Sequence, residues 1–385
     1  MTPRDNRPPA SRYRSWKSHA VLLSLWTDPA YLSYRLRRLT SPRRPAAGPA
    51  AAALPGKTVP STPAIPAGTL DGLDVDLVYC WVDGQDPAHR TKRDYWVRQC
   101  GLNPRSANPD VRYVEHDELR YSLRSAEKYA PWVRRIFIVT DGQTPRWLNT
   151  AHPKITLIDQ NAIAADPDSL PVFNSMAIEA QLHLIPGLSE HFIYSNDDMF
   201  FGQPCHREDF FTPLAPERGT DRIGMVVTLG DPENAWIVPW HWSVRSGNQL
   251  WMAQWNNVKL GLESWRPWRR ARYVTNHQAQ SMTRRALSAA ARQFPKAWRA
   301  TCRSRFRQPG DHEFLAMARY MSLWNGEARL GRHDTRIFRD AGQLNAYAPG
   351  SLPKLFCVNE ERGSSDTPPA EAYRRHFPEP SSFES

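Results

Sequence analysis

Short apolar runs and amphipathic segments alternate between residues 73 and 202. Two segments with apolar residues at helical spacing cover residues 117–129 and 175–184, and Asn174 or Ser175 fits the N-cap of the second. Four runs rich in β-branched and aromatic residues are too short for helices and end at turn residues, as buried strands do; they cover residues 75–82, 135–140, 155–158 and 191–194. Strands that alternate with helices pair in parallel through right-handed crossovers, which predicts an α/β fold with a Rossmann-like, mostly parallel sheet.

The pattern is less regular beyond Gly202. Residues 236–255 are rich in Trp, and two more helices are predicted, one over 281–293 and one that opens at Asp311 and ends near Trp324. We expect these segments to form a helical subdomain or lid over the sheet edge. The predicted organisation has three parts: a basic, Pro- and Ala-rich tail and linker over 1–72, a folded domain over 73–361, and a C-terminal tail over 362–385. The folded domain divides into an α/β core (73–202) and a Trp-rich, helical lid region (203–361).

Composition places the chain among globular proteins. Its 385 residues are 41% hydrophobic and 11% aromatic, enough for one large α/β domain with insertions or for two smaller ones. The five cysteines are scattered and form no C-x-x-C pair, which argues against a disulfide framework or a zinc ribbon. No apolar run reaches the roughly eighteen residues of a membrane helix. We therefore expect a cytoplasmic protein.

The net charge of +11 is unevenly distributed. Residues 1–50 hold ten basic and two acidic residues, so this segment is either a plain soluble tail or a peripheral contact with the inner face of the cell membrane. Residues 264–307 hold twelve Lys and Arg and no acid. Because Arg matches phosphate bidentately, the second block favours a phosphate-rich ligand, although a solvated basic face or a nucleic-acid patch would give the same pattern.

Acidic residues follow the predicted strands. Asp83, Asp141 and Asp159 end three of the runs, and Asp197 and Asp198 follow the fourth. Ligands of open parallel sheets bind outside the carboxyl ends of the strands, so we expect these acids to converge on one crevice. Adjacent carboxylates in an apolar stretch need neutralising, which predicts Mg²⁺ or Mn²⁺ at the last pair. The alternative is that one of the two caps a turn and the other is solvated.

His277 lies inside the second basic block. Basic neighbours lower the pKa of a histidine, which would suit His277 to act as a base. A histidine at such a position is also an ordinary structural hydrogen-bonding group. The Trp residues of 236–255 are open to two interpretations as well, a platform for stacking sugars or core filling.

Four blocks of the sequence resemble, in order, the conserved regions of Stealth proteins. This family comprises bacterial capsular polysaccharide phosphotransferases and the animal lysosomal-enzyme N-acetylglucosamine-1-phosphotransferase. The second block is the longest and most specific and includes LPVFNSMAIEAQ and SNDDMFFG. The blocks are Asp74–Pro87 (DVDLVYCWVDGQDP), Arg112–Gly202, Thr275–Leu323 and Lys354–Glu360 (KLFCVNE).

The resemblance implies a catalytic domain of glycosyltransferase-A-like fold over 73–361. Such a domain transfers a hexose-1-phosphate, commonly N-acetylglucosamine-1-phosphate, from a UDP-sugar to a hydroxyl of a glycan or polysaccharide and releases UMP. The chain departs from the family at Gln278, where a Pro often stands shortly after the histidine, and at Glu360, where an Asp is usual. Carried over by position, the resemblance implies Asp83, His277 and Arg307 as catalytic residues, Asp197 and Asp198 as metal ligands, and Trp81, Asn174, Ser175, Glu179 and Asn359 as substrate-binding residues.

Phosphoryl transfer depends mainly on positioning and charge neutralisation. We expect Arg307 to neutralise the transferred phosphate and His277 or Asp83 to accept the acceptor's proton. One rival hypothesis is a metal-dependent glycosyltransferase that releases UDP. Another is a polyanion-binding module that uses the basic blocks. Under the leading hypothesis the partners are a UDP-sugar donor and a glycan acceptor, and nucleic acid is not a partner.

Overall fold

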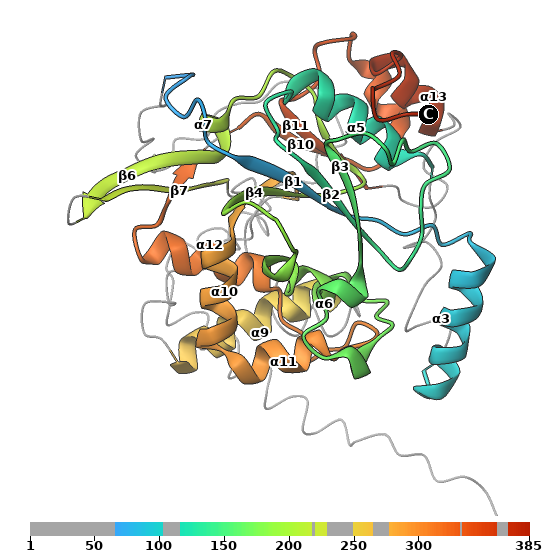
Figure 1. Ribbon diagram of the computed structural model, residues 1–385, viewed down its shortest axis with the longest axis vertical. Coiled ribbons are helices and arrows are strands. Elements are labelled where there is room, and N and C mark those ends of the chain that lie inside the picture. Colours follow the sequence, from blue (N-terminus) through green and yellow to red (C-terminus); the bar gives the residue numbers. More distant parts are fainter. Residues whose placement is uncertain are drawn as a thin grey trace, which may run out of the picture. The chain divides into compact units, whose positions relative to one another are not determined.

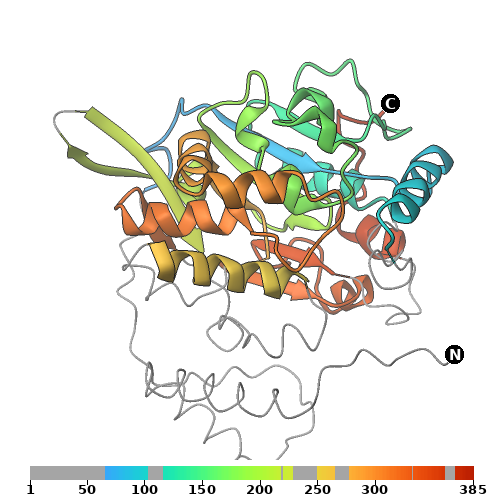
Figure 2. The ribbon, with the colours of Figure 1, turned by 90° about the horizontal axis from the view of Figure 1, so that it is seen from below.

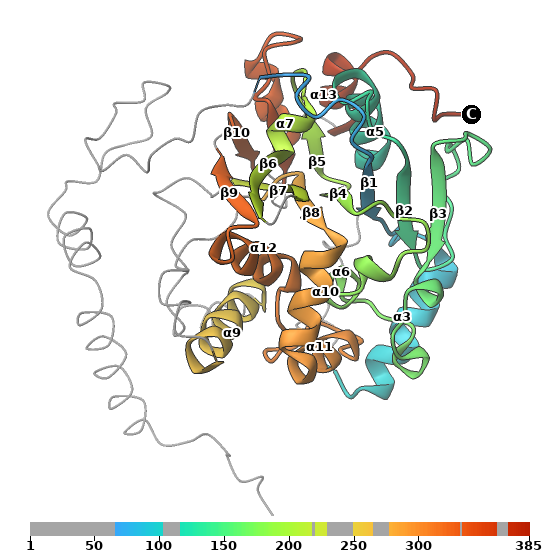
Figure 3. The same ribbon diagram turned by 60° about the vertical axis from the view of Figure 1, so that its left-hand side comes forward.

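A five-stranded sheet, sheet A, organises the part of the chain that the computed structural model describes. The described residues are 66–102, 116–217, 220–228, 249–264, 277–331, 333–359 and 369–385. Four strands are parallel and the fifth, β8, is antiparallel to β4, in the order β3-β2-β1-β4-β8 (Figure 3). The predicted α/β fold with a mostly parallel sheet is confirmed. The strands are β1 (Val75–Cys80), β2 (Ile136–Thr140), β3 (Ile155–Asp159), β4 (His191–Asn196) and β8 (Gln280–Thr283).

The central strands are buried on both faces, which explains their continuous apolar sequences. In β1, Leu77, Val78 and Tyr79 have no exposed surface. The exception is Asp76, which is also fully buried and receives two hydrogen bonds from the Arg134 guanidinium, at 2.9 and 2.7 Å. The largely apolar runs therefore form central strands because both faces of the sheet are covered and exclude water.

Helices cover the two faces of sheet A (Figures 1 and 2). Helices α5 and α13 lie on one side, while α6 and the group α9 to α12 lie on the other. Helix α3 follows β1 and extends from the carboxyl edge of the sheet. The helices are α3 (Pro87–Gln99), α5 (Glu118–Tyr129), α6 (Ser175–Glu179), α7 (Arg207–Phe210), α9 (Gln249–Ser264), α10 (Arg284–Gln293), α11 (Pro295–Cys302), α12 (Phe314–Trp324) and α13 (Pro369–His376), with short 3₁₀ turns at Gln160–Ala162, Pro167–Ser169, Leu182–Leu184 and Ala341–Ala346.

Two three-stranded sheets bring distant segments together, β10-β11-β5 and β6-β7-β9. In the first, β11 is antiparallel to β5, and the rings of Phe356 and Phe200 stack with centroids 5.0 Å apart. Gly202 permits this approach, because a Cβ there would lie 2.1 Å from the Pro353 carbonyl oxygen. The end of β11 therefore lies beside the turn that follows β4. The strands are β5 (Met199–Phe201), β6 (Phe211–Glu217), β7 (Thr220–Thr228), β9 (Ala328–Gly331), β10 (Thr335–Phe338) and β11 (Leu355–Val358).

Two predicted helix starts are wrong. The segment 281–293 begins as strand β8, and helix α10 starts only after Thr283, whose side chain accepts a hydrogen bond from the Ala286 amide. Asp311 does not cap α12, which begins after Glu313. Its carboxylate instead accepts hydrogen bonds from Asn174 and from the Gln308 amide. In both cases a long-range contact decided where the helix begins.

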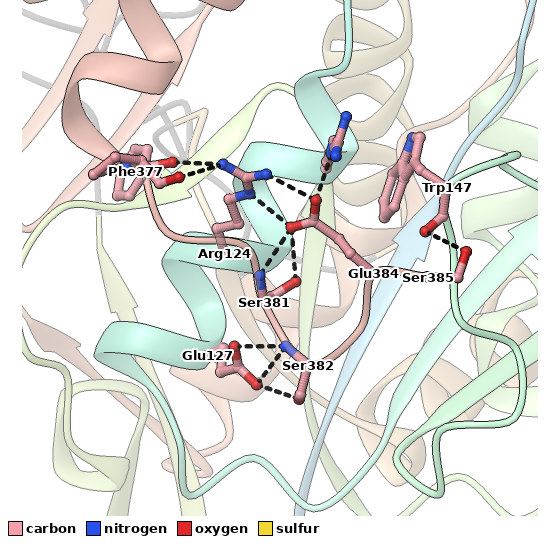
Figure 4. A network of polar contacts seen from close by, with 10 residues as sticks. Arg124, Glu127, Trp147, Phe377, Ser381, Ser382, Glu384 and Ser385 are labelled. Atoms are coloured by element: carbon pink, nitrogen blue, oxygen red, sulfur yellow. Dashed lines mark hydrogen bonds and ion pairs between the residues drawn. The ribbon is translucent and has the colours of Figure 1, made fainter.

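The described part of the C-terminal segment, residues 369–385, packs onto the fold, which corrects its expected role as a tail. Helix α13 buries Tyr373 against Phe200. Near the end of the chain, the carboxylate of Glu384 accepts hydrogen bonds from Arg124 and Arg120, each at 2.6 Å (Figure 4). Burial raises the pKa of this carboxyl, but the hydrogen bonds from Arg124, Arg120 and the Ser381 amide lower it to about 2. Residues 1–65 of the expected N-terminal tail and linker (1–72) lie outside the described residues, as do Trp236, Trp240 and Trp242.

Candidate functional site

Asp197 and Asp198 form the turn between β4 and β5, at the carboxyl edge of sheet A. The Asp197 carboxylate accepts a hydrogen bond from the Asp198 amide at 3.1 Å. The backbone carbonyl of Asp198 accepts one from the Val358 amide at 2.9 Å, which fixes the end of β11 to the turn. The turn therefore lies where the parallel topology predicts a ligand site.

The side chain of Asp198 meets two other potential ligands. The thiol of Cys357 donates to its Oδ2 at 3.2 Å, and Nε2 of His277 lies 3.8 Å from the same oxygen. One donor atom from each of the three residues fits within a mutual distance of 4.8 Å. The other carboxylate oxygen, Oδ1, is buried and has no hydrogen-bond partner among the described residues. Three separate elements thus bring an oxygen, a nitrogen and a sulfur atom to one point.

Hydrogen bonds beneath the turn hold its backbone in place. The Tyr194 hydroxyl lies 3.0 Å from a carboxylate oxygen of Glu179 and 2.6 Å from the amide oxygen of Asn196. On the neighbouring strand, the Tyr79 hydroxyl bonds Ser122 at 2.8 Å, and Ser122 donates to the Met199 carbonyl. Glu179, expected to bind substrate, is thus buried below the site and supports the residue that precedes the aspartate pair.

The charges at the site shift the pKa values of its titratable groups. Burial lowers the pKa of His277, but its contact with Asp198, assisted by Glu313 and Glu179, raises it above the usual value overall. This is opposite to the shift expected from the basic block, because the acids are the nearer neighbours. Burial and the Asp198 carboxylate raise the pKa of the Cys357 thiol well above its usual value. In this arrangement Cys357 is a neutral thiol.

Arg307 lies at the start of α6. Its guanidinium donates to the Ser175 hydroxyl at 2.7 Å. The crossover helix α6 starts at the edge where the preceding parallel strand ends, so Arg307 and Ser175 are on the same edge of sheet A as Asp198. Asn174 is fully buried and donates to the Ser304 carbonyl and to Asp311, which ties the loop carrying Arg307 to the helix start. Asn174 therefore positions Arg307 and Ser175 from below.

The acids at the other strand ends have local partners among the described residues. Asp141 pairs with Lys92 of α3 at 2.8 Å, and Asp159 caps the 3₁₀ turn at Gln160 by accepting from the Asn161 amide. The Asp83 carboxylate accepts from the Gln85 amide at 2.7 Å, and its side chain is partly exposed. Asp141 and Asp159 thus serve local contacts, and the convergence of all these acids on one crevice stays a prediction.

The remaining predicted substrate residues differ in exposure. Trp81 is buried, and its indole N–H has no hydrogen-bond partner among the described residues. Asn359 is exposed just beyond β11, and its backbone amide donates to the Phe338 carbonyl at 2.9 Å. Asn359 follows Cys357 by two residues and so lies at the rim of the site.

The described part of the basic block is mostly engaged elsewhere. Arg284 donates to the His183 and Leu188 carbonyls, and Arg305 donates to carbonyls of residues 168–171 and covers the Trp96 ring at 3.6 Å. Arg307 is the member placed at the α6 start. The block therefore does not act as one basic surface in the described residues.

Sequence reasoning missed Cys357. In KLFCVNE this cysteine resembles one more apolar residue of a buried strand, and it has no C-x-x-C partner. Cys357 becomes a candidate ligand because it lies beside Asp198, and this position depends on the pairing of β5 with β11. The block order of the resemblance, which places KLFCVNE with the other conserved regions, was the available signal.

The chemistry of the three donor atoms decides whether they could hold a metal ion. The buried, unpartnered Oδ1 of Asp198 and the mixed oxygen, nitrogen and sulfur donors fit a divalent cation. Asp197 is outside the set of three, although it directly precedes Asp198 in the turn.

Among the residues that the structure describes, none of the helices combines the length and apolar character needed to cross a bilayer.

Comparisons with known proteins identify two conserved regions in the chain. Residues 73–99 match Stealth protein conserved region 1, and residues 112–218 match conserved region 2, which contains the Asn-Asp-Asp turn. An exopolysaccharide phosphotransferase of Streptomyces coelicolor is 38% identical over 295 residues, which cover 74% of this chain and 47% of that protein. Another from Mycobacterium tuberculosis is 34% identical over 347 residues, covering 82% of this chain and 61% of that protein.

The chain therefore spans about half to three-fifths of the length of these curated relatives. The matched regions include both the strand that precedes Asp83 and the turn that carries Asp198. The chain thus carries the first two conserved regions of Stealth proteins.

Proposed function

We propose that this protein transfers a hexose-1-phosphate from a UDP-sugar to a hydroxyl of a polysaccharide and releases UMP. The observation that carries the proposal is the meeting of Asp198 and His277 at the carboxyl edge of sheet A, with 3.8 Å between Oδ2 and Nε2. The names of the relatives support phosphotransfer in exopolysaccharide synthesis. N-acetylglucosamine-1-phosphate is the group that we expect to be transferred.

The reaction makes and breaks one bond at phosphorus. The acceptor oxygen attacks the phosphorus that carries the sugar, and the bond from this phosphorus to the bridging oxygen of the diphosphate breaks. UMP leaves with that oxygen, and the acceptor's proton passes to a protein side chain. A divalent cation bound at the Asp197–Asp198 turn supplies charge neutralisation for the diphosphate.

The chain's own residues supply positioning and further charge. Arg307 binds the transferred phosphate, and its side chain is pre-positioned by the bond to Ser175 at 2.7 Å. Asn174 holds the Arg307 loop, and Glu179 holds the strand end through Tyr194. Two side chains are candidates for the proton acceptor, His277 and Asp83. Trp81 precedes Asp83 by two residues and Asn359 follows Cys357 by two residues, and both complete the proposed substrate contacts.

The compartment follows from the cysteines in this proposal. All five cysteines, each within the described residues, are free thiols. Free, scattered thiols are usual in a reducing compartment. We therefore keep the cytoplasm, at the inner face of the cell membrane, as the proposed place of reaction.

Product analysis tests the proposal. The protein is incubated with UDP-N-acetylglucosamine, a divalent cation and a polysaccharide acceptor, and the nucleotides are separated by chromatography. UMP that forms in proportion to acceptor supports the proposal. UDP would indicate attack at the anomeric carbon, and so an ordinary glycosyltransferase. No product together with salt-sensitive binding of polyanions would favour a binding module.

A further inference from the structure

The thiol of Cys357 lies where a metal ligand would lie. We propose that Asp198, His277 and Cys357 bind one divalent cation together, that Cys357 binds it as a thiolate, and that the site prefers a cation softer than Mg²⁺, with Zn²⁺ the first expectation. This inference rests on the proposed function only where it gives the cation a part in the reaction. Its geometry is independent of any substrate.

The distances suit a small four-coordinate cation. Ligand bonds to Zn²⁺ of roughly 2.0 to 2.3 Å place two ligands of a tetrahedron about 3.5 Å apart. The sulfur-to-oxygen distance at Asp198 is 3.2 Å, and the nitrogen-to-oxygen distance is 3.8 Å. All three donor atoms lie within 4.8 Å of one another. Only small side-chain movements are needed to close the three donors on one ion, which leaves a fourth position open.

The types of donor atom decide the class of cation. Mg²⁺ prefers oxygen ligands in octahedral geometry and keeps several waters. Thiolate and imidazole ligands instead select Zn²⁺ and related transition metals. Asp197 and Asp198 alone indicated an oxygen-rich site, but the structure adds one nitrogen and one sulfur within reach of the second aspartate.

Cys357 differs from the other buried cysteines of the chain. The Cys205 thiol faces a backbone carbonyl, that of Gln203, at 3.4 Å. Cys302 is buried at the end of α11. Cys357 has no exposed surface and faces a carboxylate, whose second oxygen is buried without a hydrogen-bond partner among the described residues. A cation at this point would satisfy that oxygen and replace the thiol proton.

The binding step balances as an exchange of cation for proton. The sulfur–metal bond forms, the sulfur–hydrogen bond of Cys357 breaks, and the proton passes to solvent. His277 binds through a ring nitrogen, so that nitrogen is occupied. The acceptor's proton then passes to Asp83, the other candidate base, which makes His277 a ligand and Asp83 the base.

Cobalt substitution tests the proposal without substrate. The metal-free protein is titrated with Co²⁺, and the near-ultraviolet charge-transfer band of a thiolate–cobalt bond is recorded, together with competition by Zn²⁺ and by excess Mg²⁺. We expect one equivalent of Co²⁺ to produce the band, Zn²⁺ to abolish it, and Mg²⁺ to leave it unchanged. The C357S and C357A variants should lose the band, and their affinity for Zn²⁺ should fall by at least about a hundredfold.

Matched variants separate this result from misfolding. The C205S variant removes another buried thiol and should keep the band, whereas D198N should weaken Co²⁺ binding. Circular dichroism establishes that each variant is folded, and C357A serves if C357S is not. Binding of Co²⁺ without the band, or its displacement by Mg²⁺, overturns the proposal and leaves Cys357 as a hydrogen-bond donor that positions Asp198. A band in a protein that releases no UMP would keep the metal site and refute the proposed function.

Discussion

Aspartates lie at or just after the ends of β2, β3 and β4, at the same edge of sheet A, but their carboxylates have different surroundings. Asp141 after β2 pairs with Lys92, and Asp159 at the end of β3 caps the following turn. After β4, Asp198 has one carboxylate oxygen without a hydrogen-bond partner among the described residues, close to a histidine and a cysteine. The first two aspartates complete the fold, and the third is held ready for a ligand. The acid at a strand end that indicates function here is the one with a carboxylate oxygen left without a hydrogen-bond partner among the described residues.

Replacing Asp198 gives the largest effect expected on turnover. D198N should lower kcat/KM by about a thousandfold, because a ligand and a negative charge are lost where charge develops. Stability should change by less than about 1 kcal/mol, since Asn has the size of Asp and the charged contact that is lost, to the partly exposed His277, is a long one of 3.8 Å. UMP release and thermal unfolding of the same preparation measure both effects. Full turnover by D198N would remove Asp198 from the site.

Replacing Glu384 should have the opposite outcome to replacing Asp198, a large effect on stability and a small effect on turnover. E384A leaves the Arg124 guanidinium buried without its carboxylate partner, and the free energy of unfolding should fall by about 3 kcal/mol. Urea unfolding measures the loss. UMP release per folded molecule at low temperature should stay within about twofold of the wild type. A hundredfold loss of turnover in folded E384A would contradict the distinction between Glu384, which serves the fold, and Asp198, which serves the reaction.

The same carboxylate gives a pH dependence. Its pKa is about 2 in the folded protein, below its usual value of 4.5. A lowered pKa stabilises the fold fully above pH 4.5, and this contribution is lost as pH falls toward 2. We therefore expect the stability of the wild type to fall more steeply than that of E384Q across this interval. Parallel slopes in urea unfolding at several pH values would show that the ion pair does not supply the difference.

Asp159 should give the smallest effect. D159A removes the hydrogen bond of 2.8 Å to the Asn161 amide, and loss of a cap of this kind costs about 1 kcal/mol. Turnover should remain within about twofold of the wild type. This variant is the matched control for D198N, because both change an aspartate at the same edge of sheet A. Strong loss of UMP release in D159A would return this acid to the active site.

The four parallel strands of sheet A and the Asn-Asp-Asp turn could be predicted because their signals are local, whereas β8 lies in a segment predicted to be a helix. The run Ile136–Val139 in β2 is apolar at every position, and Asn174 has both the residue type and the sequence position of a helix cap. The start of α12 could not be predicted, because Asp311 has an N-cap's side chain but uses it on Asn174, 137 positions away in the sequence.

The site could be predicted only in part for the same reason. Asp198 and His277 stand in recognisable blocks, and the structure brings them into contact. Cys357 carries no local signal of chemistry, since a buried thiol in a short strand is usually core. Its role follows from the pairing of Cys357 with Met199 across β11 and β5, which sequence periodicity does not reveal.

The pairing of β5 with β11 also sets an order of events during synthesis. The ribosome delivers β4 and the aspartate turn more than 150 residues before β11, and His277 and β8 also precede β11, so the nascent chain carries two of the three donors while the third is still absent. Binding that needs all three donors starts only after residues 355–358 have emerged and paired. The newly made chain thus remains unable to capture a cation in this way until almost all of it has been translated.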